Sequence, residues 1–208
     1  MSKNNKSSGS DFILNEYIKA SIDRMLPLYV KLFNLVFESG IVPEAWLIGD
    51  IIPIYKNKGS RCSPENYRPI TLLSCLGKIF TSVISSRLNK YVDESEILKE
   101  NQAGFRCNYS TVDNIFLLHC LIELSQIKKK KLYCAFIDFK AAFDKVWRTG
   151  LWRKLLGYGI SGKCFNVIHN MYKDSKSRIS LNCEKSDYFP CQIGVRQGEN
   201  LSPLLLEV

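Results

Sequence analysis

Apolar residues recur at the spacing of amphipathic helices along much of the chain. The pattern over residues 11–38 is helical, and Pro27 predicts a split into two helices, the second of which ends at Gly40. The clearest helix is expected over residues 71–91, where an apolar stripe alternates with a basic face. Further helices are predicted over 110–126 behind a Ser110–Asp113 capping box, in two segments of 147–172 that break at 157–162, and from Ser202-Pro203. The last of these is expected to be too short to pack.

Three other segments are typical of β-structure. Residues 47–55 form an apolar run, and Pro53 within it favours an edge strand or a bulge. Residues 178–182 and 188–193 predict a hairpin around a polar turn. Leu132–Ile137 contains no Gly or Pro and is too apolar for a solvated face, so it is expected to be a buried strand.

This predicted strand ends on Asp138. A carboxylate in that position is costly unless it is paired or binds a metal ion. Two interpretations stay open, a functional carboxylate or a capping or ion-pairing Asp. Phe143 would stand near Asp138 if the chain turns into a helix after Phe139.

A basic, proline-containing segment over residues 56–69 is a second candidate site. Lys56 lies in a basic turn, and Arg68 precedes Pro69, which favours an extended backbone. An extended Arg beside a lysine can clamp phosphates, because guanidinium binds them bidentately. A surface salt bridge is the alternative.

Composition favours an anionic partner and a reducing compartment. The 208 residues include 29 Lys and Arg against 20 Asp and Glu, a net charge of +9. This charge suits nucleic acid, although an indifferent basic surface is equally compatible. Eight cysteines without a C-x-x-C pair, and no secretory signal, indicate reduced thiols in an intracellular protein of the nucleus or cytoplasm. The isolated His119 and His169 disfavour a zinc site, and no apolar run is long enough for a membrane span.

Four segments, in this order, resemble the reverse transcriptase of non-LTR (LINE-type) retrotransposons. They are PEAWLIGDIIPIYKNK with SPENYRPITLLSCLGKIF, then NQAGFRCNYSTVDNI, AFIDFKAAFDKVW and GVRQGENLSPLLL. The resemblance extends from about Asn15 to Leu206. Each segment is weak alone, but their combination and order are highly specific to that family.

The resemblance implies a right-hand polymerase with an α+β fold that is rich in helix and has a small antiparallel sheet. A disordered tail is expected over residues 1–14, upstream helices and fingers over 15–131, and a partial palm over 132–208, with the reverse transcriptase domain at about 36–208. The implied reaction is template-directed addition of deoxynucleotides to a primer 3′ end. RNA template, DNA primer and deoxynucleoside triphosphates are therefore the expected partners, and two Mg²⁺ ions the expected cofactors.

Individual roles carry over by motif match. Asp138 matches the catalytic, metal-ligating aspartate, and the backbone carbonyl of Phe139 is the usual neighbouring ligand. Phe143 matches the steric-gate position, where a bulky ring would collide with a ribose 2′-hydroxyl. The positions expected to contact the incoming nucleotide or the template are Lys56, Arg68, Arg196, Gln197 and Gly198.

One departure from the family pattern bears on activity. The family carries a Y-x-D-D motif on a later palm hairpin, whereas this sequence contains no Asp-Asp dipeptide. Mg²⁺ needs several anionic ligands, so Asp138 alone is not expected to hold two ions. The chain is interpreted as a fragment truncated before that motif and inactive alone. The alternatives are a non-catalytic nucleic-acid-binding module and an unfolded remnant with open sheet edges.

Overall fold

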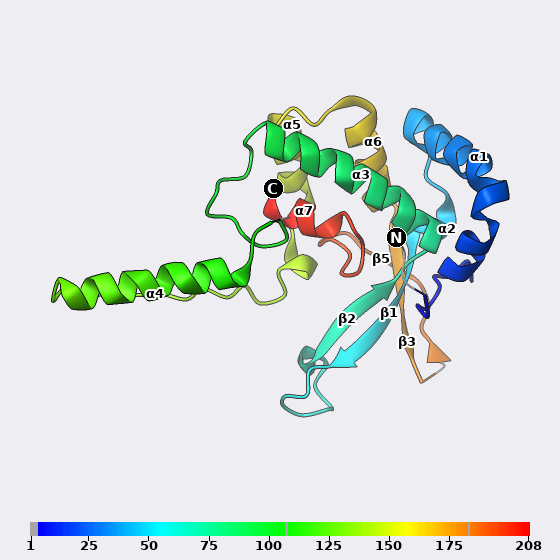
Figure 1. Ribbon diagram of the computed structural model, residues 1–208. Helices are drawn as coiled ribbons and strands as arrows, with labels where there is room; N and C mark the ends of the chain where they lie inside the picture. Colours follow the sequence, from blue (N-terminus) through cyan, green and yellow to red (C-terminus); the bar gives the residue numbers. More distant parts are fainter. Residues whose placement is uncertain (1–3, 107, 183) are drawn as a thin grey trace.

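A computed structural model describes residues 4–106, 108–182 and 184–208 (Figure 1). The helices are α1 (Asn15–Ser39), α2 (Glu44–Leu47), α3 (Cys75–Glu94), α4 (Thr111–Ile127), α5 (Arg148–Gly157), α6 (Gly162–Lys173) and α7 (Ser202–Glu207). The strands are β1 (Ile48–Tyr55), β2 (Tyr67–Leu72), β3 (Lys176–Leu181), β4 (Glu184–Lys185) and β5 (Phe189–Pro190). Two 3-10 turns, η1 (Pro64–Asn66) and η2 (Phe143–Lys145), complete the elements. The fold is therefore α+β, as expected.

The strands form one small sheet in the order β2-β1-β3-β4, and β5 also pairs with β3. β1 pairs with β2 antiparallel but with β3 parallel, so the expectation of a purely antiparallel sheet is wrong. The long, largely helical connection between β1 and β3 permits this parallel pair. Pairing with β3 stops at Ile51, so at Pro53 the described sheet has a neighbour on one side only, where a residue without an N–H is tolerated.

Helix boundaries follow local signals in most places. Gly40 ends α1 in the left-handed region at φ 69° and donates its N–H to the carbonyl of Val36. The Ser110–Asp113 capping box begins α4 as predicted. The predicted split at Pro27 is wrong, because α1 runs through it unbroken. Its surrounding turn is exposed, so water can satisfy the carbonyl that Pro27 leaves without a donor.

The helix predicted over residues 71–91 begins later, because residues 67–72 form β2 instead. The side chain of Ser74 accepts from the N–H of Gly77 and caps α3 at Cys75. Phe80, on the predicted apolar stripe of α3, packs against Trp46, with ring centroids 5.4 Å apart.

The hydrophobic core lies between α3, α5, α6 and α7, with α1 and α2 against it (Figure 1). Its fully buried members include Ile168 and Tyr172 of α6 and Leu155 of α5. The expectation that the helix after Ser202 is too short to pack is wrong. Leu204 and Leu205 of α7 are buried in this core, because neighbouring helices supply the apolar surface that one short helix lacks.

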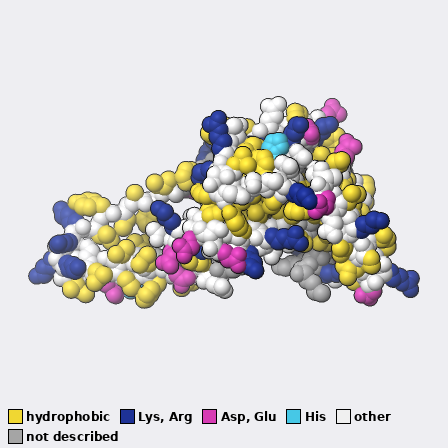
Figure 2. All heavy atoms as spheres, turned by 90° about the horizontal axis from the view of Figure 1, so that it is seen from above, with side chains coloured by type: hydrophobic (Ala, Val, Ile, Leu, Met, Phe, Trp, Pro, Cys, Tyr) yellow, Lys and Arg dark blue, Asp and Glu magenta, His cyan; other side chains and the backbone are white. Residues whose placement is uncertain are grey.

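Helix α4 and the returning segment 132–139 form an arm that projects from the core (Figure 1). No described residue of α4 is buried, and apolar side chains are visible along the arm (Figure 2). The prediction of a buried strand at Leu132–Ile137 is wrong, since these residues are exposed and lie outside every described strand. Their apolar character cannot bury them here, because no described strand lies alongside to pair with their backbone.

Two expectations from composition concern the thiols and membrane spans. The cysteines among the described residues, at 62, 75, 120, 134, 164 and 191, are all free thiols, while Cys107 and Cys183 lie outside the described residues. Within the same part of the chain, no helix combines the length and apolarity needed to cross a membrane.

A partly buried ion cluster joins the sheet strands. Asp50 of β1 accepts from Nε of Arg178 on β3 at 2.8 Å and from Nζ of Lys185 on β4 at 3.1 Å. Burial by itself raises the pKa of the Asp50 carboxyl, but the hydrogen bonds from both cations outweigh it and leave the pKa below its ordinary value. The cluster therefore stabilises the folded sheet while Asp50 is ionised.

We expect Asp50→Asn to lower the free energy of unfolding by about 1–3 kcal/mol, because three partly buried charge-assisted hydrogen bonds lose their anion. This contribution is complete above the unfolded pKa of about 3.9 and is lost as pH falls through the lower folded pKa. Urea unfolding at neutral and acidic pH measures both effects. Glu94→Gln, which breaks the exposed pair with Lys90, is the control and should change little. Equal losses in the two variants would contradict this account.

Candidate nucleotide-binding site

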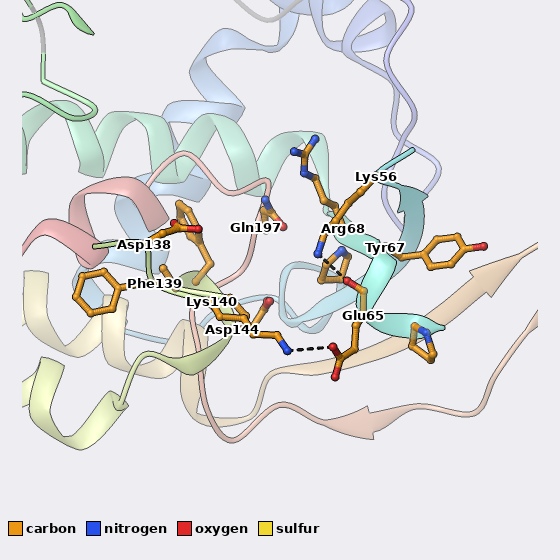
Figure 3. A pocket seen from close by; sticks show the side chains of 14 residues that line it. Lys56, Glu65, Tyr67, Arg68, Asp138, Phe139, Lys140, Asp144 and Gln197 are labelled. Atoms are coloured by element: carbon orange, nitrogen blue, oxygen red, sulfur yellow. Dashed lines mark hydrogen bonds and ion pairs between the residues drawn. The ribbon is translucent and has the colours of Figure 1, made fainter. Parts of the chain in front are cut away.

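A cavity of about 640 Å³ lies where three distant segments meet (Figure 3). The β1–β2 hairpin contributes Lys56 and Arg68, residues 138–144 contribute Asp138 with the adjoining turn, and the loop after β5 contributes Gln197. The cavity thus has both cationic and anionic walls.

The cavity lining includes the carboxylates of Glu65, Asp138 and Asp144. Asp138 is exposed and makes no hydrogen bond or ion pair with another described residue. Asp144 also lines the cavity, where burial raises the pKa of its carboxyl and the charge of Lys56 opposes that shift. Among the described residues, no group of three His, Cys, Asp or Glu is placed to hold a metal ion. Asp138 therefore does not fit a complete two-ion magnesium site without further ligands.

Two phenylalanine rings line the cavity, and they differ in how well they are packed. The side chain of Phe139 is 77% exposed. Phe143 is half-buried against the core and meets Phe105 edge to face, with ring centroids 6.1 Å apart. Of the two rings, Phe143 is the one with a fixed position.

The loop Gly194–Gly198 places its residues on opposite sides. The guanidinium of Arg196 is buried and donates to the backbone carbonyls of Trp46 and Leu47, away from the cavity lining. Gln197 is half-buried and lines the cavity, and its carbonyl accepts from the amide of Thr71 at 2.9 Å. Gly198 lies outside the lining, with φ at 119°.

Two backbone hydrogen bonds join this loop to the segment that carries Asp138. The amide of Gly194 donates to the carbonyl of Val146 at 2.9 Å, and the amide of Val195 donates to the carbonyl of Phe143 at 2.8 Å. A Cβ on Gly194 would stand 2.7 Å from the carbonyl oxygen of Asp144, so only glycine permits this approach.

The guanidinium of Arg148 reinforces the same junction. It is buried, and its Nε donates to the carbonyl of Gly194 at 2.8 Å. Its other nitrogens donate to the carbonyls of Tyr172, Cys191 and Ile193. A guanidinium carries five N–H donors in a rigid planar arrangement, so one Arg can bind several backbone carbonyls at once.

Sequence reasoning missed Arg148, although one signal was present. A cation in the first turn of a helix opposes the helix dipole, so an Arg that begins α5 needs another reason to be there.

A second buried polar group, formed by Tyr172, Glu199 and Ser202, lies just after Gly198 and holds that end of the loop. The hydroxyl of Tyr172 donates to the carboxylate of Glu199 and lies 3.1 Å from the hydroxyl of Ser202. Burial and the neighbouring carboxylate raise the pKa of Tyr172 well above its ordinary value, so the hydroxyl keeps its proton and remains a donor. Sequence reasoning also missed this group.

Six of the eight predicted site residues lie on the one cavity. They are Lys56, Arg68, Asp138, Phe139, Phe143 and Gln197. Arg196 and Gly198 belong to the same loop but not to the cavity lining. The cavity combines cations, a ring held by packing, and the carboxylates of Asp138 and Asp144, neither of which has a hydrogen-bond or ion-pair partner among the described residues. This arrangement suits a phosphorylated ligand with an apolar part.

Comparisons with known proteins agree with this description. The family model for reverse transcriptase (RNA-dependent DNA polymerase) matches residues 54–208. The probable RNA-directed DNA polymerase from transposon BS of Drosophila melanogaster is 34% identical over 205 residues, 98% of this chain and 22% of the relative. The RNA-directed DNA polymerase from mobile element jockey of the same fly is 31% identical, with 98% and 22% covered. A Pol polyprotein from retrotransposable element R2 of Nasonia vitripennis is 30% identical, with 84% and 17% covered.

The chain belongs to the reverse transcriptase family, within the group found in non-LTR retrotransposons, as its sequence motifs indicated. It spans about a fifth of the length of the curated relatives it matches.

We expect Gly194→Ala to lower the free energy of unfolding by more than about 1 kcal/mol, because the residue has a φ of 76° and no room for a methyl group. Gly157→Ala in α5 is the matched control, since no described atom lies within 4 Å of the place that its methyl group would take. That control should raise stability by up to about 1 kcal/mol. Thermal unfolding of both variants checks the prediction, and a neutral Gly194→Ala would refute the close approach.

Proposed function

We propose that this chain supplies the nucleotide-binding face of an RNA-directed DNA polymerase. In this proposal residues 15–131 are upstream helices and fingers, and residues 132–208 are part of the palm. The polymerase would add deoxynucleotides to a primer 3′ end on an RNA template. The observation that carries the proposal is the placement of Lys56, Arg68 and Asp138 around one cavity.

Each wall has a role in the proposal. Lys56 and Arg68 would bind the triphosphate, with Arg68 able to contact it bidentately. Phe143 would limit space at the ribose 2′ position, because its ring is fixed by packing against Phe105. Gln197 would line the base or template side.

Divalent ions enter the proposal through the family, whose chemistry uses them. Asp138 and the backbone carbonyl of Phe139 would contribute oxygen ligands for Mg²⁺. At least one more carboxylate has to be supplied by a segment other than those described.

The 208-residue chain alone is expected to show no template-dependent primer extension, because no group of three carboxylates or other metal ligands among the described residues is placed to position the ions. A primer-extension assay with Mg²⁺ or Mn²⁺ measures this directly. Synthesis that is template-dependent and abolished by Asp138→Ala would overturn the inactivity while confirming the role of Asp138.

Nucleic-acid binding without chemistry is a second candidate function, favoured by the tip of the β1–β2 hairpin. Lys56, Lys58 and Arg61 gather there. The guanidinium of Arg61 lies 5.3 Å from the ring centroid of Tyr55, which in turn stands 5.4 Å from that of Tyr67. Both rings are half-buried, and cations beside accessible aromatic rings are typical of single-strand binding surfaces.

Binding of an RNA–DNA primer-template is expected to weaken steeply with salt, through release of counterions. The double variant Lys58→Ala/Arg61→Ala should reduce the salt slope by about 2, since each lost phosphate contact removes about 0.9. Fluorescence anisotropy over a salt series gives the slopes. Lys31→Ala/Lys173→Ala removes two exposed lysines away from the hairpin and should leave the slope unchanged. A flat salt response in the unmodified chain would exclude this function.

A further inference from the structure

Lys140 is a third cation of the cavity to which the motif match assigns no role. It lies on the wall opposite Lys56 and Arg68 (Figure 3). Its ammonium is 3.0 Å from the carboxylate of Glu65, a residue 75 positions earlier in the chain. This ion pair crosses from the 138–144 wall to the β1–β2 hairpin.

The backbone next to Lys140 is held in an unfavourable conformation. Ala141 has φ at 57°, in the left-handed region that residues with a side chain rarely adopt. The carbonyl of Ala141 accepts from the amides of Asp144 and Lys145, and these bonds hold the turn. A strained backbone conformation persists only where the surrounding structure holds it, and such conformations are concentrated at ligand-binding sites. The left-handed conformation of Ala141 determines the direction of the backbone next to Lys140.

Glu65 contacts both walls of the cavity. Its backbone carbonyl accepts from the ammonium of Lys56 at 2.7 Å, and its carboxylate accepts from Lys140. The hydrogen bond from Lys140, followed by the charges of Lys140 and Lys56, lowers the pKa of the Glu65 carboxyl. The carboxylate therefore stays ionised and remains the partner of Lys140 at neutral pH.

The Lys140–Glu65 ion pair contributes little to the stability of the fold, and an anionic ligand can replace Glu65 as the partner of Lys140. The side chains of Lys140 and Glu65 are 74% and 72% exposed, and ion pairs so exposed are weak. The cavity lining has three cations, Lys56, Arg68 and Lys140, balanced by three carboxylates. A polyphosphate brings more charge and more acceptor oxygens than one carboxylate, so it can displace Glu65 from Lys140.

We propose that Lys140 binds a phosphate of the incoming nucleotide and that Glu65 is the counter-ion it leaves when the nucleotide arrives. This inference rests on the proposed function, because it needs a triphosphate in the cavity. Lys56 and Arg68 then hold the triphosphate from the hairpin side and Lys140 holds it from the side of Asp138.

Equilibrium binding of dTTP and of inorganic tripolyphosphate to the 208-residue chain tests the inference, in low salt with a chelator present. Lys140→Ala should raise both dissociation constants about tenfold, since a charge-assisted contact is lost. Glu65→Gln should lower both several-fold, since the competing anion is removed. Lys173→Ala, which removes an exposed lysine outside the cavity lining, is the control and should change neither constant by as much as twofold.

The outcomes separate the inference from the proposed function. If the unmodified chain binds both ligands but Lys140→Ala has no effect, Lys140 is not a phosphate-binding residue and the cavity assignment survives. If Glu65→Gln weakens binding as Lys140→Ala does, Glu65 supports the site and the exchange is wrong. If the unmodified chain binds neither ligand, the cavity assignment and the inference both fail.

Discussion

The site depends on one junction, at which the amides of Gly194 and Val195 donate to the carbonyls of Val146 and Phe143. These two hydrogen bonds hold the loop that carries Gln197 against the turn that follows Asp138. The absence of a side chain at Gly194 permits the approach, and the carbonyl of Gln197 extends it to β2 through the amide of Thr71. Without this junction, the cavity would have two walls instead of three.

Buried polar groups stiffen the inner side of this junction, while the cations on its outer side are exposed to solvent. The guanidinium of Arg148 donates to backbone carbonyls, and that of Arg196 donates to the carbonyls of Trp46 and Leu47 in α2. The bonded nitrogens of these buried guanidiniums would be costly to leave unpaired, so both arginines hold their carbonyl partners in place, although Nε of Arg196 has no hydrogen-bond partner among the described residues. Lys56, Arg68 and Lys140 are exposed instead, which suits them to meet an anionic ligand. The same residue type therefore serves architecture or binding according to its burial.

Sequence reasoning succeeded where a signal is local. The left-handed stop at Gly40 and the capping box at Ser110 are encoded within a few residues, so both were predictable. The family motifs, which occur in a fixed order, also led to six residues that line one cavity, and their roles there stay predictions. Leu132–Ile137 was not, because a strand forms only where a partner strand lies alongside, and the pattern of one segment contains no information about its partner.

The direction in which a side chain points was the other property that could not be predicted from the sequence. Arg196 and Gln197 are neighbours in one motif, yet the loop turns the first into the protein and the second toward the cavity. Arg148 was missed because its role is visible only when four carbonyls from distant segments converge on it. Such convergence is a property of the tertiary structure.

Amide hydrogen exchange tests the central claim most directly. If the junction holds the site together, the amides of Gly194, Val195 and Thr71 exchange as slowly as those in the middle of α3, because they open only with the core. The amides of residues 132–137 serve as the internal reference and exchange rapidly, since they lie outside every described strand. Equally rapid exchange at Gly194 and Val195 would contradict the account and would leave the cavity without its third wall.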